Sequence, residues 1–351
     1  MIKIFPLCPE SIEELSQEKA LYISDFRALG ESFEYEIDSM WKYENLMPWI
    51  VKKGFCTVNE NSHNLSYPSA NLSVIICEQG DRPSIPIIKR IKNTDSLFSK
   101  LDQIWTAVPH PEIDKISSQL SLPLNYKYSE FLNFNNKLSV KKLLGDLTPD
   151  WHTISDLNML KGDYKSGKYI IKRSIGAGGF TTFFPNSIEL PEKLLSLFSS
   201  NDCDWYSEEL IDSIPMSIQC YKNDDDITIF GYSKQIMGNN VEFIGAEFLD
   251  LESLKKDTVL QNFILRTLSN LNSFLSNFRG FFGIDFFYDS NKNYYFLEIN
   301  ARVTALTIPV LLHNQKLLDT SKYFEDYDGN ISKVKYLLTV ESKLKTYDVI
   351  I

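Results

Sequence analysis

Two aromatic-rich runs late in the chain decide the fold: Gly280-Phe-Phe-Gly-Ile-Asp-Phe-Phe-Tyr288 and Tyr294-Tyr-Phe-Leu-Glu-Ile-Asn-Ala-Arg-Val-Thr304. The polar segment Asp289-Ser-Asn-Lys-Asn293 separates them, which predicts a β-hairpin. Each run places one acid among apolar residues, Asp285 in the first and Glu298 in the second. Because a carboxylate in an apolar strand is costly unless it is paired or binds a cation, both acids are candidate functional residues.

The spacing within the second run favours a metal site. Asn300 follows Glu298 by two residues, so both side chains leave the same face of an extended strand. Two carboxylates and an amide oxygen are hard ligands suited to Mg²⁺ that bridges nucleotide phosphates, with Mn²⁺ as an alternative. Arg302 lies two residues further on and would hold an anionic substrate. The competing interpretation is that these acids form ion pairs in an ordinary sheet.

A second candidate is the segment Lys168-Tyr-Ile-Ile-Lys-Arg-Ser-Ile-Gly-Ala-Gly-Gly-Phe-Thr-Thr-Phe183, which predicts a strand, a glycine turn and another strand. Its glycines would let backbone N–H groups approach a polyphosphate, with Lys172 beside them. A plain hairpin with a solvated lysine is the alternative. A P-loop is excluded, since Phe180 follows Gly179 where the motif needs Lys before Ser or Thr.

A third segment, Trp205-Tyr-Ser-Glu-Glu-Leu-Ile211, predicts a strand that runs into an irregular polar stretch, Asp212-Ser-Ile-Pro215. Such a hinge could offer backbone groups to an adenine and an acid to a ribose. An acidic loop end is the plainer interpretation.

These segments, in this order, resemble the motifs of the ATP-grasp superfamily, in particular carboxylate–amine ligases similar in fold to biotin carboxylase and D-alanine–D-alanine ligase. The resemblance covers roughly residues 109–313. It also assigns a nucleotide-binding lysine to Asn135-Asn-Lys137. The site residues that it implies are, for ATP, Lys137, Lys172, Gly176, Gly178, Gly179, Glu208, Glu209, Leu210 and Ile211; for the metal, Asp285, Glu298 and Asn300; and for catalysis, Arg302 and Lys234.

The resemblance implies an ATP- and Mg²⁺-dependent ligase. A substrate carboxylate would take the γ-phosphoryl group, giving ADP and an acyl phosphate, and an amine would then displace phosphate to form an amide. Two alternatives stay open: transfer to a carrier-protein thiol, and a catalytically silent nucleotide-binding module. In one departure, Pro215-Met-Ser-Ile-Gln219 lacks the acid that often meets the ribose in this family, and Asp212 would have to replace it.

The predicted fold class is α/β (α+β): an ATP-grasp fold with a small N-terminal α/β domain. The N-terminal domain is predicted at residues 1–110, where short apolar runs alternate with helical spacing and indicate a parallel sheet. Within it, Ser11–Leu29 has helical spacing and Leu72–Cys77 reads as a buried strand. The ATP-grasp domain is predicted at residues 111–351, with a lid subdomain at about 147–206.

Composition bounds the partners. The 351 residues are 43% hydrophobic and 23% charged, an ordinary globular balance, and the net charge of −10 argues against nucleic acid. No apolar run is long enough to span a membrane. The five scattered cysteines, without a CxxC pair, indicate reduced thiols and a cytoplasmic location. Expected partners are a small-molecule carboxylate and an amine, with a homodimer expected because relatives frequently form one. Lys141 and Lys142 read as a solvated basic cluster.

Overall fold

The computed structural model describes residues 1–26, 29, 47–59, 72–77, 100–176, 179, 181–185, 190–200, 203–224, 226–238, 243–316, 322–324, 335–338 and 347–350. Gly178 of the predicted glycine turn lies outside the described residues.

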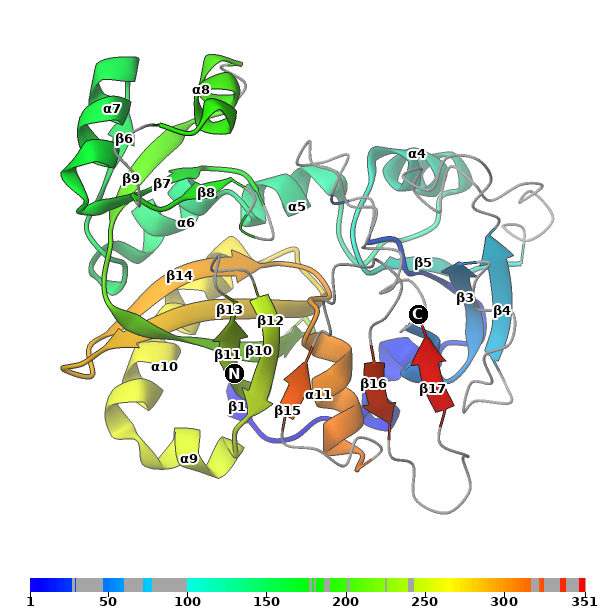
Figure 1. Cartoon of the computed structure of the whole chain (residues 1–351). Coiled ribbons are helices and arrows are strands. Elements are labelled where there is room, and N and C mark those ends of the chain that lie inside the picture. The colour runs from blue at the N-terminus through cyan, green and yellow to red at the C-terminus, as the bar shows by residue number, and fades with distance from the viewer. Residues whose placement is uncertain are drawn as a thin grey trace.

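A central sheet carries the predicted hairpin (Figure 1). Its strand order is β14-β13-β10-β11-β12-β15, all antiparallel, with β1 added in parallel to β11. The strands are β1 (Ile2–Ile4), β10 (Ser213–Lys222), β11 (Ile227–Met237), β12 (Phe243–Phe248), β13 (Gly280–Asp289), β14 (Tyr294–Asn300) and β15 (Lys322–Phe324). The irregular stretch predicted at 212–215 is therefore wrong from Ser213 onward, because those residues pair with the end of β13.

Helices cover both faces of this sheet. On one face α9 (Leu251–Lys256) and α10 (Thr258–Phe274) pack, with the ring of Phe263 5.6 Å from that of Phe286. On the other face α11 (Thr307–Asn314) approaches so closely that a Cβ on Gly231 would lie 2.6 Å from Val310. A glycine is thus needed there, and helix and sheet meet directly.

The hairpin of β13 and β14 turns where the sequence predicts. The carboxylate of Asp289 accepts hydrogen bonds from the backbone N–H groups of Asn291 and Asn293, and Lys292 adopts a left-handed φ of 62°. An aspartate that holds its own turn in this way fixes the hairpin register.

A separate four-stranded sheet, at the upper left of Figure 1, occupies most of the range predicted as a lid, and it is called the lid here. Its antiparallel order is β6-β9-β7-β8. The elements are β6 (Trp151–Ile154), α7 (Leu157–Ser166), β7 (Tyr169–Arg173), β8 (Thr182–Phe183), α8 (Glu192–Ser199) and β9 (Trp205–Glu209). The lid has its own small core, which includes Leu160, Ile171 and Trp205.

The N-terminal residues form a parallel sheet of order β4-β3-β2-β5, as predicted. Its strands are β2 (Ala20–Ile23), β3 (Gly54–Asn59), β4 (Leu72–Cys77) and β5 (Gln103–Thr106). The helix predicted from Ser11 is wrong: 3-10 turns at Pro9–Ser11 and Glu13–Ser16 lead into β2. Because β2 is buried throughout between β3 and β5, its continuous apolar run suits a strand although the spacing also fits a helix.

Strand β1 does not belong to that parallel sheet but to the central one. The two sheets also share a core, where the rings of Trp105 and Phe281 lie 5.9 Å apart. The domain boundary at residue 110 stays a prediction. Strand β1 lies before that boundary in the sequence but belongs to the central sheet.

The remaining described elements connect these units. The helices α4 (Pro111–Leu120), α5 (Tyr128–Phe134) and α6 (Lys137–Leu144) lead from the N-terminal sheet to the lid, with further 3-10 turns at Met47–Trp49 and Gly145–Leu147. Near the C-terminus β16 (Lys335–Leu338) pairs with β17 (Tyr347–Ile350). In Figure 1, α5 and α6 pass between the lid and the central sheet, which places α6 beside both.

Candidate functional site

The predicted metal ligands come together on the hairpin. Asp285 and Glu298 are direct cross-strand partners, and Asn300 lies two residues further along β14 on the same face. The amide Nδ2 of Asn300 donates to Asp285 Oδ2 at 2.9 Å. Gln235 of β11 donates to the other oxygen, Asp285 Oδ1, also at 2.9 Å. Both oxygens of Asp285 are thereby oriented, and the amide oxygen of Asn300 is the atom suited to a cation.

The two carboxyl groups titrate differently because their surroundings differ. Burial, and then the neighbouring Glu298 charge, raises the pKa of Asp285 to about 7. Burial also opposes ionisation of Glu298, but the positive charges of Lys137, Arg302 and Lys172 outweigh it and lower the pKa of that carboxyl. Glu298 is therefore ionised, whereas Asp285 needs added positive charge to be ionised fully at neutral pH.

Helix α6 brings Lys137 to this pair. Its Nζ lies 3.2 Å from Glu298 Oε2 and donates to the carbonyl oxygen of Gly176 at 2.8 Å. The Asn136 side chain caps the helix by accepting from the Ser139 N–H, which fixes Lys137 in the first turn. One lysine thus connects the hairpin to the glycine turn of the lid.

A buried three-charge group lies next to it. The carboxylate of Glu208 on β9 receives Lys141 Nζ at one oxygen and Lys172 Nζ at the other, each at 2.5 Å. The side chains are 0% (Lys141), 8% (Lys172) and 1% (Glu208) exposed. The prediction of a solvated Lys141 is wrong; Lys142 is exposed as expected. Burial raises the pKa of Glu208, but both lysines outweigh it and lower the pKa below its ordinary range.

Tyr206 adds a polar atom to the same place. It pairs with Lys172 across the lid sheet and lies fully buried, with the Lys141 Nζ 5.8 Å from its ring centroid. Its hydroxyl has no hydrogen-bond partner within the part of the chain that the structure describes. Burial, followed by the nearby charges of Glu208 and Glu298, raises the pKa of Tyr206 well above its ordinary value. A buried hydroxyl without a hydrogen-bond partner costs free energy, so we expect the Tyr206 hydroxyl to have a partner that the described residues do not supply.

Arg302 follows β14 and lies beside the carboxylate hairpin. Its Nη1 donates to Asn135 Oδ1 at 3.0 Å, and the residue is 8% exposed. The same Asn135 oxygen accepts from the backbone N–H of Ala301, which fixes the turn after β14. The guanidinium is close enough to oppose the rise in the pKa of Asp285 and to help lower the pKa of Glu298.

The glycine turn joins β7 and β8. A Cβ on Gly176 would lie 2.2 Å from Thr181 Oγ1, so this position has no room for a side chain. Gly179 has a φ of +75°, a conformation that favours glycine. Both positions require glycine, as a close-fitting turn does.

Several polar groups of the predicted hinge have partners within the chain. The Glu208 carboxylate is occupied by its two lysines. The backbone N–H groups of Glu209 and Leu210 donate to Asp150 and Lys168. These groups are engaged within the sheet, so a nucleotide contact there would use carbonyl groups or Ile211. Leu210 is 40% exposed and offers an apolar surface.

Lys234 lies apart from this group. It pairs with Met216, which in turn pairs with the core residue Phe286, and it is exposed. Its neighbour Gln235, on the opposite face of β11, is the residue that reaches Asp285. The structure therefore brings Gln235 to the carboxylates in place of Lys234.

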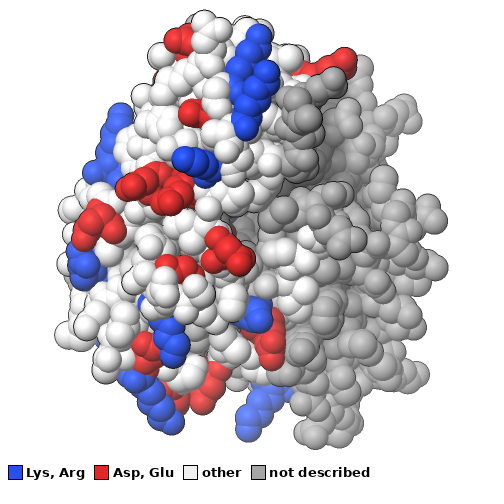
Figure 2. Space-filling model, turned by 60° about the vertical axis from the view of Figure 1, so that its left-hand side comes forward, with Lys and Arg blue, Asp and Glu red and all other residues white. Residues whose placement is uncertain are grey.

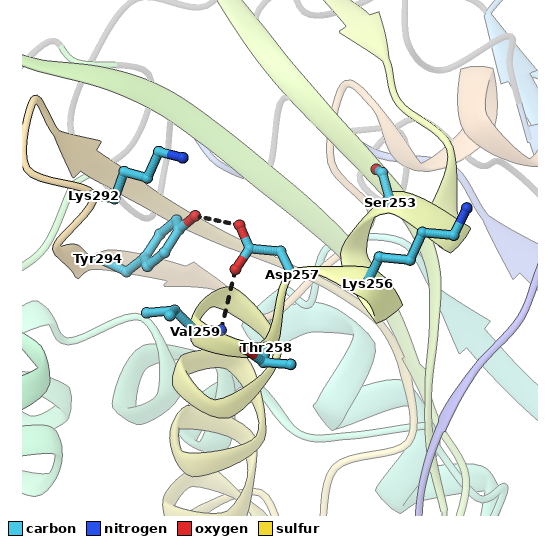
Figure 3. Close-up of a pocket in the computed structure, with 7 residues that line it drawn as sticks. All are labelled: Ser253, Lys256, Asp257, Thr258, Val259, Lys292 and Tyr294. Carbon is cyan, nitrogen blue, oxygen red and sulfur yellow. Dashed lines mark hydrogen bonds between the residues drawn. The ribbon is translucent and has the colours of Figure 1, made fainter.

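A hollow of about 510 Å³ lies elsewhere, where the start of α10 meets the β13–β14 turn (Figure 3). Figure 3 shows the Asp257 carboxylate accepting from the Tyr294 hydroxyl and the Val259 N–H. The acid at its centre is satisfied by its own chain, and the hollow lies at the far end of β14 from Asn300.

The comparisons with known proteins agree with this geometry. A family model described as an ATP-grasp domain matches residues 134–306. The chain contains an ATP-grasp domain. The predicted superfamily and fold class are confirmed, and the carboxylate hairpin, the glycine turn and the hinge all lie within the matched ATP-grasp residues. No curated protein sequence matches the chain.

Several solved structures share the ATP-grasp fold. Biotin carboxylase from Campylobacter jejuni is 13% identical, with a TM-score of 0.59 over 86% of this chain and 72% of that one. L-amino acid ligase from Bacillus licheniformis is 15% identical, with a TM-score of 0.52 over 87% and 72%. N5-carboxyaminoimidazole synthetase from Staphylococcus aureus, complexed with ADP, is 15% identical, with a TM-score of 0.50 over 83% and 74%.

The donor set of this ATP-grasp domain fits Mg²⁺ held jointly with phosphates. Two ionisable carboxyls and an amide oxygen lie on one face, and no three His, Cys, Asp or Glu side chains cluster among the described residues. Mg²⁺ commonly takes one or two protein carboxylates and completes its shell from water and phosphate. A nucleotide would therefore supply the remaining oxygens.

Sequence reasoning missed Lys141, Tyr206 and Gln235. Lys141 follows Lys137 by four residues, so the helical period already placed both on one face of α6. Tyr206 carried no signal beyond its strand.

On the surface, Figure 2 shows acidic and basic side chains interspersed over the described part of one face. No helix in the described ranges has the length and apolar character to cross a bilayer.

Proposed function

We propose that this protein is an ATP- and Mg²⁺-dependent carboxylate–amine ligase, which forms an acyl phosphate and ADP and then an amide. The observation that carries the proposal is the convergence of Glu298, Lys137 and Gly176, which joins the carboxylate hairpin to the glycine turn of the lid. The solved relatives with this fold include an L-amino acid ligase, whose name describes such chemistry.

The nucleotide would lie between the lid sheet and the hairpin. Lys137 and Lys172 are the lysines that can reach its phosphates, and the turn at Gly176 and Gly179 would close over them. Asp285, Glu298 and Asn300 would hold Mg²⁺, or Mn²⁺ in its place. When bound, the ion would neutralise charge on the phosphates as the phosphoryl group moves. The hinge Glu208-Glu-Leu-Ile211 would border the adenine through backbone groups and the Leu210 side chain.

The first chemical step needs little beyond positioning and charge. A carboxylate oxygen of the substrate attacks the γ-phosphorus, and the bond from that phosphorus to the β,γ-bridging oxygen breaks, which releases ADP. The buried Arg302 can hold the attacking carboxylate, because Asn135 fixes its guanidinium beside the hairpin. The lid, with its own core, would close over the site and exclude water from the acyl phosphate.

In the second step an amine nitrogen attacks the acyl carbon, the bond to the phosphate oxygen breaks, and the nitrogen loses a proton to give the amide. Arg302 would steady the negative charge on the carbonyl oxygen. The carboxylate and the amine are small molecules in this proposal. A homodimer and a cytoplasmic location remain expectations from the sequence.

The experiment that tests the function is an ADP-release screen of carboxylic acids crossed with amines, in the presence of MgATP. We expect ADP and phosphate to appear when both a suitable acid and a suitable amine are present. Release that needs a carrier-protein thiol would favour the alternative acceptor. MgATP binding without ADP release across the whole screen would favour a silent nucleotide-binding module and contradict the ligase.

A further inference from the structure

Helix α6 presents two lysines, one turn apart, to two different sheets. Lys137 contacts Glu298 of the central sheet, and Lys141 contacts Glu208 of the lid. Residues four apart lie on one helix face, so the same face holds both carboxylates. The Glu208 carboxylate in turn contacts Lys172, the lid lysine beside the glycine turn. The Lys141 side chain cannot contact a ligand directly, because it is 0% exposed.

The charges of the group Lys141–Glu208–Lys172 do not cancel. Two ammonium groups share one carboxylate, each through a charge-assisted hydrogen bond to a different oxygen. Burial lowers the pKa of Lys141, and the Glu208 carboxylate opposes that change. With both lysines protonated, the group carries one positive charge in excess, in a place where a buried charge is costly unless it is compensated. Lys172, with 8% of its side chain exposed, is the member that faces outward.

We propose that Lys141 is a positioning residue of the nucleotide site: by occupying one oxygen of Glu208, it leaves Lys172 with positive charge available to a nucleotide phosphate. This inference rests on the proposed function. Without Lys141, the whole charge of Glu208 falls on Lys172, and the pair becomes neutral. With Lys141, Glu208 fixes where Lys172 lies without cancelling its attraction for an anion.

The test measures binding of Mg²⁺ and a non-hydrolysable ATP analogue, AMP-PNP, by titration calorimetry. Lys141→Met should weaken binding about tenfold, the effect of one unit charge about 12 Å away at an effective dielectric constant near 20. Lys141→Gln, which keeps a donor for Glu208 without the charge, should weaken binding similarly. Both variants should fold, because Glu208 keeps Lys172 as its partner.

The matched control is Lys142→Met, the next residue of α6, which removes the same formal charge from an exposed position. It should leave affinity unchanged. The double variant Lys141→Met with Glu208→Gln restores one uncompensated charge on Lys172, and its affinity should return to within about threefold of the wild type. A merely structural role of Lys141 would not allow this recovery.

The outcomes separate this inference from the function on which it rests. If the wild type binds the analogue and Lys141→Met binds equally well, the role of Lys141 is refuted and the ligase proposal stands. Weak binding that persists in the double variant also refutes the charge role. A wild type that does not bind the analogue overturns the proposed function itself.

Discussion

Asp285 of β13 and Glu298 of β14 lie directly opposite one another, so the hairpin places two half-buried carboxyl groups side by side. Glu298 has a lysine partner in Lys137, whereas Asp285 is held by the amides of Gln235 and Asn300. Like charges this close are unfavourable unless a cation lies nearby. The two carboxyl groups therefore suit a bound cation, because the side chains around them supply only part of the positive charge that they need.

This arrangement predicts a pH dependence of stability without metal or nucleotide. Burial and Glu298 raise the pKa of Asp285 to about 7, above its ordinary value of 3.8. A raised folded-state pKa gives stability that is present below pH 3.8 and is lost as the pH rises through about 7. Relative to Asp285→Asn, the wild type should lose on the order of 1 kcal/mol or more of unfolding free energy between pH 4 and pH 7. Denaturant unfolding across this range checks it; parallel curves would contradict it.

The metal assignment predicts that Glu298→Gln abolishes turnover while the protein stays folded. The change is nearly isosteric but removes a charged ligand, so we expect ADP formation to fall on the order of a hundredfold or more. Glu252→Gln, on the exposed surface of α9, is the control and should keep full activity. ADP formation by Glu298→Gln near the control rate would remove Glu298 from the metal site.

The glycine turn predicts a steric effect. In Gly176→Ala the new Cβ would meet the Thr181 hydroxyl at 2.2 Å, so the turn must shift and the ATP KM should rise several-fold. Gly162→Ala in α7 is the matched control: a Cβ there meets nothing within 4 Å, and alanine should stabilise the helix by about 0.5–1 kcal/mol. If both variants keep the wild-type KM for ATP, the turn has a structural role alone.

The buried hydroxyl of Tyr206 predicts a ligand-dependent effect. Because it has no partner in the described structure, Tyr206→Phe should leave the ligand-free protein as stable as the wild type or more so. If the hydroxyl bonds a nucleotide oxygen, MgATP affinity should fall about tenfold. Tyr294→Phe loses a hydrogen bond to Asp257 far from the site and should show the reverse: lower stability and unchanged affinity. Equal affinity in both variants would exclude Tyr206 from the nucleotide site.

The sequence predicted the elements whose local chemistry is strong. Asp289 with Asn291 and Asn293 determines the hairpin turn, and the alternation on both sides puts Asp285, Glu298 and Asn300 on one face. The lid strands and the parallel N-terminal sheet also followed from apolar runs punctuated by glycine and proline. The hairpin was predictable because the interactions that determine its turn join residues close together in the sequence.

Features that depend on distant pairing were not predictable. Lys141 and Lys142 look alike in sequence, and Glu208 on β9 decides that one is buried and the other exposed. Ile2–Ile4 joins the central sheet across more than two hundred residues of chain, at β11. Lys234 and Gln235 are consecutive residues and point to opposite faces of β11. The strand pairing of β11 determines that Gln235 is the one that faces Asp285.

The most direct test of the account follows oxygen from the acid substrate. With a carboxylic acid labelled in both oxygens with ¹⁸O, an amine and MgATP, phosphoryl transfer to the carboxylate leaves one labelled oxygen in the released phosphate. Lys137, Lys172 and the carboxylate hairpin converge where the terminal phosphates would lie, so we expect ADP and singly labelled phosphate. AMP and pyrophosphate as the main products, with the label in AMP, would contradict both the acyl phosphate and the ligase mechanism.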